Sequence, residues 1–228
     1  MRKVSIYLGV FLFLLGAGCA SFTLEKGVGQ PVLLKIFVVR HGQAYSNLRP
    51  APDMPKEKLD SLTPQGLQQA KLAGEYLRGK NIVTVIASPT GRTRETARII
   101  AEEVGLKGAF TENPAFASMK DGKTPDGKPS AMAWRVAQWG AGQDPRPEGG
   151  ESLADATRRA VEAVQALATP YRAKALVIVT HSEICAGLAG HADNTPVHQR
   201  YDKHLIDFAS VLEIAISQKG TWELLRKR

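Results

Sequence analysis

The sequence predicts an α/β fold in three layers, in which helices cover both faces of a mostly parallel, doubly wound sheet. Three short runs of apolar, often β-branched residues have the composition of strands that are buried on both faces. Amphipathic helical patterns separate these runs, and such alternation is typical of parallel βαβ units. Ligands bind such sheets beyond the carboxyl ends of the strands, so a site is expected in the residues that follow each run.

The three predicted central strands are residues 32–39 (VLLKIFVV), 81–88 (NIVTVIAS) and 174–182 (KALVIVTHS). Near the end of the chain, residues 208–217 and 221–228 flank the tripeptide QKG. This pattern is typical of a hairpin, and it is expected to close one edge of the sheet.

Three amphipathic helices are predicted between and after these strands. The first covers residues 62–80, with Thr63 as its N-cap and Pro64 at its first position. The second covers residues 88–106 and ends at Gly105, and the third covers residues 151–172. Each is long enough to cover one face of the sheet.

The segment 119–150 differs from the rest of the chain, because Gly, Pro and charged residues surround one short helical piece at residues 131–139. A connection of this length is usually functional or mobile. Trp134 and Trp139 are interpreted either as a lid over a site or, preferably, as anchors to the body of the protein. The segment and the turn PEGGES (147–152) are expected to shape a leaving-group pocket.

The first 18 residues have the pattern of an export signal, and residues 19–31 have that of a linker to a domain at 32–228. Arg2 and Lys3 precede an apolar run at residues 4–15, which small residues follow. An uncleaved anchor or a buried helix is the alternative. The stretch LLGAGC resembles the lipobox of bacterial lipoproteins, with Cys19 as the lipidated residue, although Gly16 stands where the lipobox normally has leucine. Both export routes predict a periplasmic or cell-envelope location, with a membrane contact through the N-terminal lipid.

Composition favours a small anionic partner over nucleic acid. The formal net charge is +8, and without Arg2 and Lys3 it remains +6. The basic residues are scattered, and neither zinc-ligand spacing nor an aromatic RNA-binding motif occurs. No cofactor or metal is therefore expected. The two cysteines argue against a disulfide framework, and Cys185 is expected to be a buried packing residue.

The ends of three predicted strands carry side chains that can bind an anion or act as nucleophiles. They are RHG at residues 40–42, SPTGR at 88–92 and THS at 180–182, and each delivers a cation or a histidine to the same edge of the sheet. One such ending would carry little weight, because an isolated histidine is usually structural. Three endings in order indicate a site that binds and attacks an anion.

With LTPQGLQQA and PEGGES, these endings form an ordered set of motifs: VVRHGQAYSN, LTPQGLQQA, IASPTGRTRETA, PEGGES and VIVTHSE. The set resembles that of the histidine phosphatase superfamily, the phosphoglycerate mutase-like group of phosphatases and mutases. The resemblance covers the chain from Leu34 to about Trp222. It implies the three-layer, phosphoglycerate mutase-like sandwich and phosphoryl transfer without a metal.

The resemblance makes His41 the nucleophile that takes the phosphoryl group. A neutral imidazole has an exposed lone pair, and nearby cations should lower the pKa of His41 and keep the ring neutral. Arginine suits the phosphate pocket because its planar fork matches two oxygens. Arg94 is expected at the surface. Asn47 can alternatively be a turn residue, and Ser88 can alternatively cap the following helix. The residues that the resemblance assigns to phosphate binding are Arg40, Asn47, Ser88, Arg92, His181 and Ser182.

A general acid is needed to protonate the leaving group. By resemblance to the mutase-like branch, Glu112 in FTENPAF is the first candidate, although the Arg-His-Tyr-Gly run that follows in mutases is absent here. Glu183, next to Ser182, is the second candidate. Glu151 is the third, although a place at a helix N-terminus explains it adequately.

These features predict an exported phosphatase that hydrolyses a small phosphomonoester, with a rate optimum on the acidic side of neutral. The absent Arg-His-Tyr-Gly run makes a mutase the weaker reading. The alternative of another class is a lipoprotein that keeps the scaffold and binds phosphate or another anion without turnover.

Overall fold

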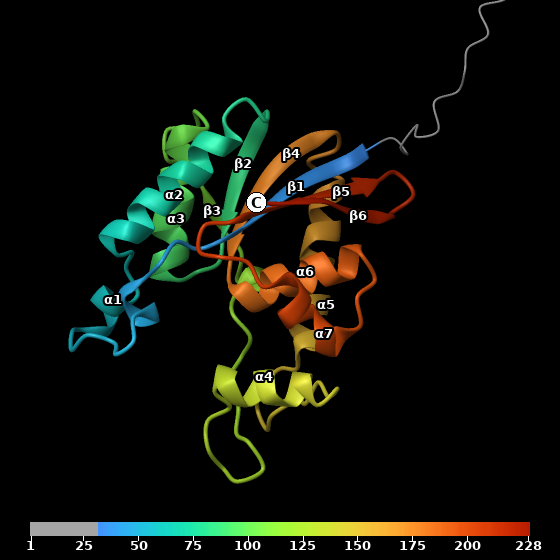
Figure 1. The fold of residues 1–228 in the computed structure, drawn as a ribbon. Helices are drawn as coiled ribbons and strands as arrows, with labels where there is room; N and C mark the ends of the chain where they lie inside the picture. Colours follow the sequence, from blue (N-terminus) through green and yellow to red (C-terminus); the bar gives the residue numbers. More distant parts are fainter. Residues whose placement is uncertain (1–31) are drawn as a thin grey trace, which may run out of the picture.

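The computed structural model describes residues 32–228, so the predicted export signal, the linker and Cys19 lie outside the described residues. Six strands form one sheet in the order β3-β2-β4-β1-β5-β6 (Figure 1). Strands β1 to β4 pair in parallel, and β5 and β6 are antiparallel. The strands are β1 Val32–Arg40, β2 Ile82–Ala87, β3 Thr111–Glu112, β4 Lys174–Thr180, β5 Val211–Ser217 and β6 Trp222–Lys227.

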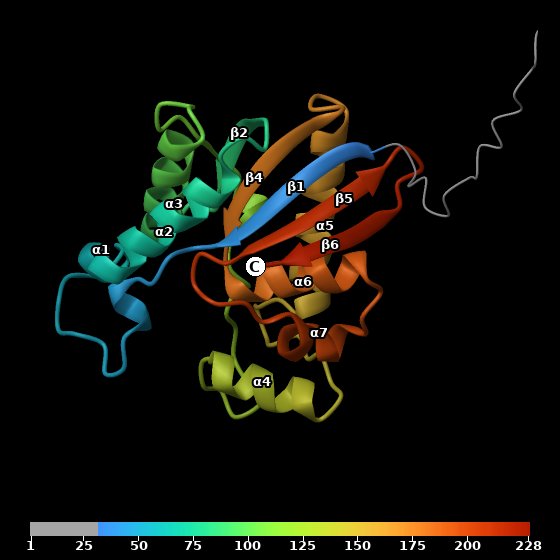
Figure 2. The same cartoon turned by 45° about the horizontal axis from the view of Figure 1, so that its top comes forward.

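Helices cover both faces of the sheet, which confirms the predicted fold class (Figure 2). Helices α2 and α3 bury one apolar cluster against the sheet, and α5 and α6 bury a second cluster on the other face. The α-helices are α1 Lys56–Leu59, α2 Pro64–Leu77, α3 Gly91–Glu103, α4 Met132–Gly140, α5 Leu153–Ala168, α6 Ser182–Ala192 and α7 Val197–His204; the 3-10 turns are η1 Tyr45–Asn47 and η2 Pro114–Phe116.

Local sequence signals position the first helices as predicted. The Thr63 side chain accepts a hydrogen bond from Gly66 N at 3.0 Å, and Pro64 opens α2. Helix α3 ends before Gly105, whose φ of 86° favours glycine. A Cβ on Gly42 would lie 2.5 Å from Gly66 O, so the glycines of RHG and LTPQG let the two motifs touch.

The predicted end of the third helix was wrong. Helix α5 ends at Ala168 and not at residue 172, because residues 169–173 turn the chain into β4. Helix α6 ends at Ala192, and in its last turn the His191 ring packs against Trp222 with 4.9 Å between centroids. Cys185 is buried in the core as predicted.

The segment 119–150 is tied to the body at several points. Lys123 bridges to both Pro129 and Glu148, and α4 packs against α7. Trp139 is buried, its Nε1 donates to Asp144 Oδ1 at 3.0 Å, and its ring lies 5.0 Å from that of Tyr201. Trp139 therefore anchors the segment. None of the helices within residues 32–228 has the length and apolar character needed to cross a membrane.

Candidate active site

The carboxyl ends of β1, β2 and β4 bring three motifs to one edge of the sheet. Arg40 pairs with Thr180, and Ala87 pairs with Val179, so the residues that follow these strands emerge side by side. The rings of His41 and His181 lie edge to face, with 5.3 Å between their centroids, and both side chains are almost fully buried. The predicted meeting of RHG and THS is thus seen directly.

The His41 ring is held so that one nitrogen faces the site. Its Nδ1 lies 2.8 Å from the Gly42 carbonyl oxygen and donates to it. That bond places the proton on Nδ1 and leaves the lone pair on Nε2. Gly42 N in turn donates to Thr96 Oγ1 at 3.0 Å, which ties this turn to α3. The arrangement suits a nucleophile with a fixed tautomer and a fixed direction of attack.

The His181 ring is fixed from the neighbouring strand end. Its Nε2 donates to Ser88 Oγ at 2.8 Å, while its Nδ1 accepts from Arg92 Nη2 at 3.1 Å. Ser88 therefore orients His181 and does not cap the following helix, whose N-cap is Thr90.

One guanidinium group contacts both imidazoles. Arg92 Nε donates to His41 Nε2 at 3.2 Å, at the atom that carries the lone pair. Its Nη1 donates to Asp60 Oδ1, and Asp60 Oδ2 also accepts from Gly91 N at 2.6 Å. Asp60 fixes Arg92 and the start of α3 together. Sequence reasoning missed Asp60, because it lies just before the LTPQGLQQA motif and outside it, 32 residues from the arginine that it holds.

Arg40, the last residue of β1, is held by the segment before β5. Its Nη1 donates to the Ile206 carbonyl at 2.7 Å, and its guanidinium carbon lies 4.0 Å above the centre of the Phe208 ring. Its buried Nε has no hydrogen-bond partner among the described residues. The contact of Arg40 with phosphate stays a prediction.

Burial and the arginines keep both histidines neutral. Burial lowers the pKa of His41 well below its usual range, and His181 and Arg92 lower it further. Burial, with the charges of Arg92 and Arg40, lowers the pKa of His181 to about 3. Both rings are therefore unprotonated in mildly acidic solution, as a nucleophile requires.

Asn47 and Ser182 lie close to the site in sequence but make local bonds. Asn47 Oδ1 accepts from Ala44 N at 3.0 Å and closes η1, which matches its reading as a turn residue. The Ser182 hydroxyl donates to Glu183 Oε2 at 3.1 Å at the start of α6. Their contact with phosphate stays a prediction.

Glu112 is the last residue of β3, at the same edge of the sheet, and forms a bidentate ion pair with Arg94. Arg94 Nε and Nη2 each donate to one of its carboxylate oxygens at 2.9 Å. Both side chains are exposed, as expected for Arg94. The hydrogen bond and charge of Arg94 lower the pKa of Glu112, so this acid candidate is ionised unless the pair opens.

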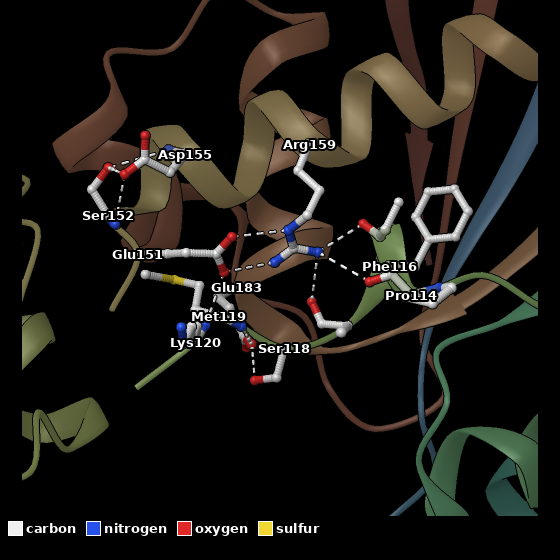
Figure 3. A network of polar contacts seen from close by, with 12 residues as sticks. Pro114, Phe116, Ser118, Met119, Lys120, Glu151, Ser152, Asp155, Arg159 and Glu183 are labelled. Atoms are coloured by element: carbon white, nitrogen blue, oxygen red, sulfur yellow. Dashed lines mark hydrogen bonds and ion pairs between the residues drawn. The ribbon is translucent and has the colours of Figure 1, made fainter. Parts of the chain in front are cut away.

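Glu183 has a structural place that the sequence did not show. Its carboxylate accepts from the hydroxyl of Ser118 and, at 3.1 Å, from Met119 N (Figure 3). It is buried beside the strand end that carries His181. Glu183 thus fastens the start of segment 119–150 to α6.

Glu151 also binds within this network. Arg159 on α5 donates to both Glu151 oxygens at 3.0 and 2.8 Å, and its Nη1 donates to the Ala115 carbonyl at 2.8 Å (Figure 3). Glu151 also accepts from Lys120 N at 2.9 Å. Through these contacts Glu151 ties the start of segment 119–150 to α5. Of the three acid candidates, Glu112 is therefore the exposed one at this edge of the sheet.

A hollow of about 550 Å³ opens beside Arg92. Its lining comes from the connection between β1 and α2 and from the start of α3. Segment 119–150 contributes no residue to this hollow, and a leaving-group pocket shaped by that segment stays a prediction. The lining residues are Ser46, Lys56, Glu57, Leu59, Asp60, Thr90 and Arg92. Within residues 32–228, no cluster of three or more His, Cys, Asp or Glu side chains is arranged to hold a metal ion.

Comparison with known proteins agrees with this geometry. The sequence model of the histidine phosphatase superfamily (branch 1) matches residues 36–228. The chain belongs to this superfamily.

Among its relatives are proteins named probable phosphoglycerate mutase GpmB. That of Erwinia tasmaniensis is 30% identical over 152 residues, which are 64% of this chain and 69% of the relative. That of Yersinia enterocolitica is 31% identical over 153 residues, with the same coverage.

Solved structures share the fold. YhfR of Bacillus stearothermophilus has a TM-score of 0.67 at 23% identity, over 84% of this chain and 95% of that protein. A mycobacterial glucosyl-3-phosphoglycerate phosphatase has a TM-score of 0.65 at 22% identity, over 83% and 96%. A phosphoserine phosphatase mutant from Entamoeba histolytica has a TM-score of 0.65 at 18% identity, over 85% and 96%.

Proposed function

We propose that this protein is a phosphatase that hydrolyses small phosphomonoesters through a phosphohistidine on His41. The observation that carries the proposal is the unprotonated Nε2 of His41, whose lone pair accepts a hydrogen bond from Arg92 Nε while Nδ1 donates to the Gly42 carbonyl. Arg92, Arg40 and His181 surround that atom with donors and positive charge, and such preorganised groups stabilise the charge on a phosphoryl group in transfer.

In the first step, the lone pair of His41 Nε2 forms a bond to phosphorus while the bond from phosphorus to the ester oxygen breaks. The incoming phosphoryl oxygens take over the hydrogen bond that Arg92 Nε makes to His41. The departing alkoxide takes a proton from an acid, for which Glu112 is the proposed donor once it leaves Arg94.

In the second step, a water oxygen attacks phosphorus, the bond to Nε2 breaks, and the water proton passes to the carboxylate that gave up its proton. Inorganic phosphate leaves and neutral His41 is restored. Neither step calls for a metal, and a protonated acid near several cations favours a rate optimum below neutral pH.

The test is release of inorganic phosphate from a panel of phosphomonoesters, including phosphoserine and phosphorylated sugars. The protein should release phosphate, and His41→Ala should reduce release by at least a thousandfold. Equal release by the variant would refute the proposal. Release by neither protein, while both fold and bind phosphate, would favour the anion-binding lipoprotein.

A mutase is the second candidate, because the curated relatives carry that name. The two activities differ in where the phosphoryl group goes. Phosphorus NMR of a phosphoglycerate incubated with the protein distinguishes transfer to another hydroxyl from transfer to water. Free phosphate is expected, and an isomerised phosphoglycerate without phosphate release would identify a mutase.

We also propose that the chain is exported, in keeping with residues 1–18, and that lipid on Cys19 holds it at a membrane. Such a location fits release of phosphate from soluble esters or from envelope sugars. Globomycin-sensitive shortening of the chain in a bacterial host would support lipidation, whereas an unprocessed chain in the cytoplasm would oppose export.

A further inference from the structure

The end of the sheet opposite the active site is unusual in its charge. Four loops lie there: residues 78–81 after α2, 104–110 after α3, 169–173 after α5 and 218–221 between β5 and β6 (Figures 1 and 2). Together they contain five basic residues and no Asp or Glu, and Lys174 follows at the first position of β4. We call these loops and Lys174 the basal face. Its basic residues are Arg78, Lys80, Lys107, Arg172, Lys174 and Lys219.

Most of these cations have no acidic partner. Within the part of the chain that the structure describes, only Arg78 of the six forms an ion pair, with Glu103 at the end of α3. The acids nearest in sequence that stay unpaired are Glu75 in the last turn of α2 and Glu223 at the start of β6. The basal face therefore has an excess of exposed positive charge.

The two ends of the sheet differ in this respect. The connections at the catalytic end contain many acids, among them Asp53, Asp60, Asp121 and Asp144. The two ends thus differ in their acidic residues, because lysines occur at both ends, whereas the described loops at the amino end of the parallel strands contain no Asp or Glu.

Exposed apolar side chains accompany these cations. Val32 is 46% exposed and Val83 is 39% exposed. Both line a hollow of about 390 Å³ together with Lys80, Lys174 and Lys35, of which Lys35 forms an ion pair with Glu213. Apolar side chains ringed by lysines are suited to the boundary between lipid headgroups and acyl chains, where the ammonium groups meet phosphates.

The chain also reaches the described domain at this face. Strand β1 begins there at Val32, and the 31 residues before it contain Arg2, Lys3 and the apolar run 4–15. A tether from this apolar run, or from a lipid on Cys19, would therefore join the described domain at the face that carries the basal cations.

We propose that the basal face docks onto the surface of an anionic lipid bilayer and turns the catalytic edge away from it. The contact rests on the basal charges, and its setting rests on the proposed export. Each exposed Lys or Arg near such a surface strengthens binding roughly fivefold, and salt screens the effect. The site would then face soluble phosphomonoesters and not the headgroups of the membrane that holds the protein.

The test uses the full chain on phosphatidylcholine vesicles with and without phosphatidylglycerol, with amide hydrogen exchange as the readout. On vesicles with phosphatidylglycerol, exchange in the basal loops is expected to slow at low salt and to recover at high salt. The loops at the catalytic edge should be unchanged. This pattern does not depend on any phosphatase activity.

Two matched variants distinguish the loss of basal charges from the loss of positive charge elsewhere on the protein. Changing Lys80, Arg172, Lys174 and Lys219 to Gln should abolish the protection and weaken salt-sensitive vesicle binding at least tenfold. Changing four lysines of the catalytic end, Lys58, Lys120, Lys123 and Lys128, to Gln should leave both unchanged.

Several outcomes would overturn the proposal. Equal protection on vesicles without phosphatidylglycerol, equal loss in the two variants, or protection at the catalytic edge would each do so. Basal protection that grows with protein concentration in the absence of lipid would assign the face to a second copy of this chain. Salt-sensitive binding to single-stranded DNA but not to vesicles would assign it to nucleic acid.

Discussion

At the scale of single residues, Arg92 is the centre of the site because it contacts both imidazoles and is itself held by Asp60. Its guanidinium donates to the atom of His41 that carries the lone pair, and in the proposed mechanism an incoming phosphate replaces that partner of Arg92. We therefore propose that Asp60, a partly buried carboxylate, positions Arg92 for phosphate binding.

Asp60→Asn should therefore lower kcat/KM by about tenfold to a hundredfold, because the loss of a charge-assisted bond frees Arg92 to adopt other rotamers. The expected split is a higher KM with a smaller change in kcat, and Asp60→Glu should recover part of the loss. Steady-state kinetics and phosphate inhibition measure both. Asp53→Asn, an exposed neighbour, is the control and should behave as the parent protein.

Arg94 should set the protonation of Glu112. Removal of its hydrogen bond and charge in Arg94→Gln raises the pKa of Glu112 toward the ordinary 4.5. A proton donor acts only while protonated, so the alkaline limb of the kcat profile should move to higher pH. Arg98→Gln, which breaks the exposed pair with Glu102, should not move it. An unmoved limb in Arg94→Gln would exclude Glu112 as the acid.

The sequence alone identified the candidate histidines and arginines of the site, but not the residues that hold them in place. The identities of His41, Arg92 and His181 follow from motifs, because each motif lies next to a strand end. Asp60 and Phe208 lie far from those motifs in the chain and touch the arginines only after folding. The role of Glu183 was hidden for the same reason, because its partners are 64 and 65 residues away.

At the scale of elements, segment 119–150 depends on one buried cation. Arg135 on α4 is only 2% exposed, and its guanidinium donates to the Glu151 and Lys120 carbonyls at 2.7 and 3.0 Å and to Ser130 Oγ at 3.1 Å. Two separate parts of the segment, and Glu151 directly after it, thus converge on one side chain.

Arg135→Ala should destabilise the protein by about 2 to 3 kcal/mol, because several buried acceptors lose their donor. Chemical denaturation measures this, and limited proteolysis should show faster cleavage within residues 119–150. Arg146→Ala removes an exposed pair with Asp155 and should cost less than about 1 kcal/mol. Equal effects of the two variants would show that Arg135 does not hold the segment.

Element-scale prediction was accurate where capping and periodicity were strong and weak where elements are short. Thr63 and Pro64 predict the start of α2, and Gly105 predicts the end of α3. Strand β3 has only two residues, Thr111 and Glu112, and exists because β2 offers an edge to pair with. Such a strand has no periodicity of its own that a sequence pattern can show.

At the scale of the whole molecule, the buried neutral histidines link stability to pH. The pKa of each ring is lower in the folded protein than the ordinary 6.5, so the unfolded chain binds more protons between the two values. Stability is therefore complete above about pH 6.5 and falls as the pH drops toward the folded-state value, which is about 3 for His181.

The free energy of unfolding should fall by a few kcal/mol between neutral pH and pH 4. Urea denaturation at a series of pH values measures the fall. The variant His181→Asn, which cannot titrate, should show a shallower fall over the same range. A parallel pH dependence in the two proteins would mean that His181 does not contribute.

The fold class was predictable because both faces of the sheet are covered, which makes the central strands continuously apolar. The difference in charge between the two ends of the sheet could not be predicted from the sequence. Lys80, Lys174 and Lys219 are far apart in the chain and come to the same end only when the strands align. The catalytic end and the basal end are separated by the length of the sheet.

The most direct measurement is identification of a phosphorylated residue after a brief mixing of the protein with a phosphomonoester and an alkaline quench. Mass spectrometry of the digested chain should find a phosphoryl group on His41 that survives alkali and is lost in acid, and none in His41→Ala. Phosphate release without any phosphorylated histidine, or a phosphoryl group on a different side chain, would contradict the mechanism.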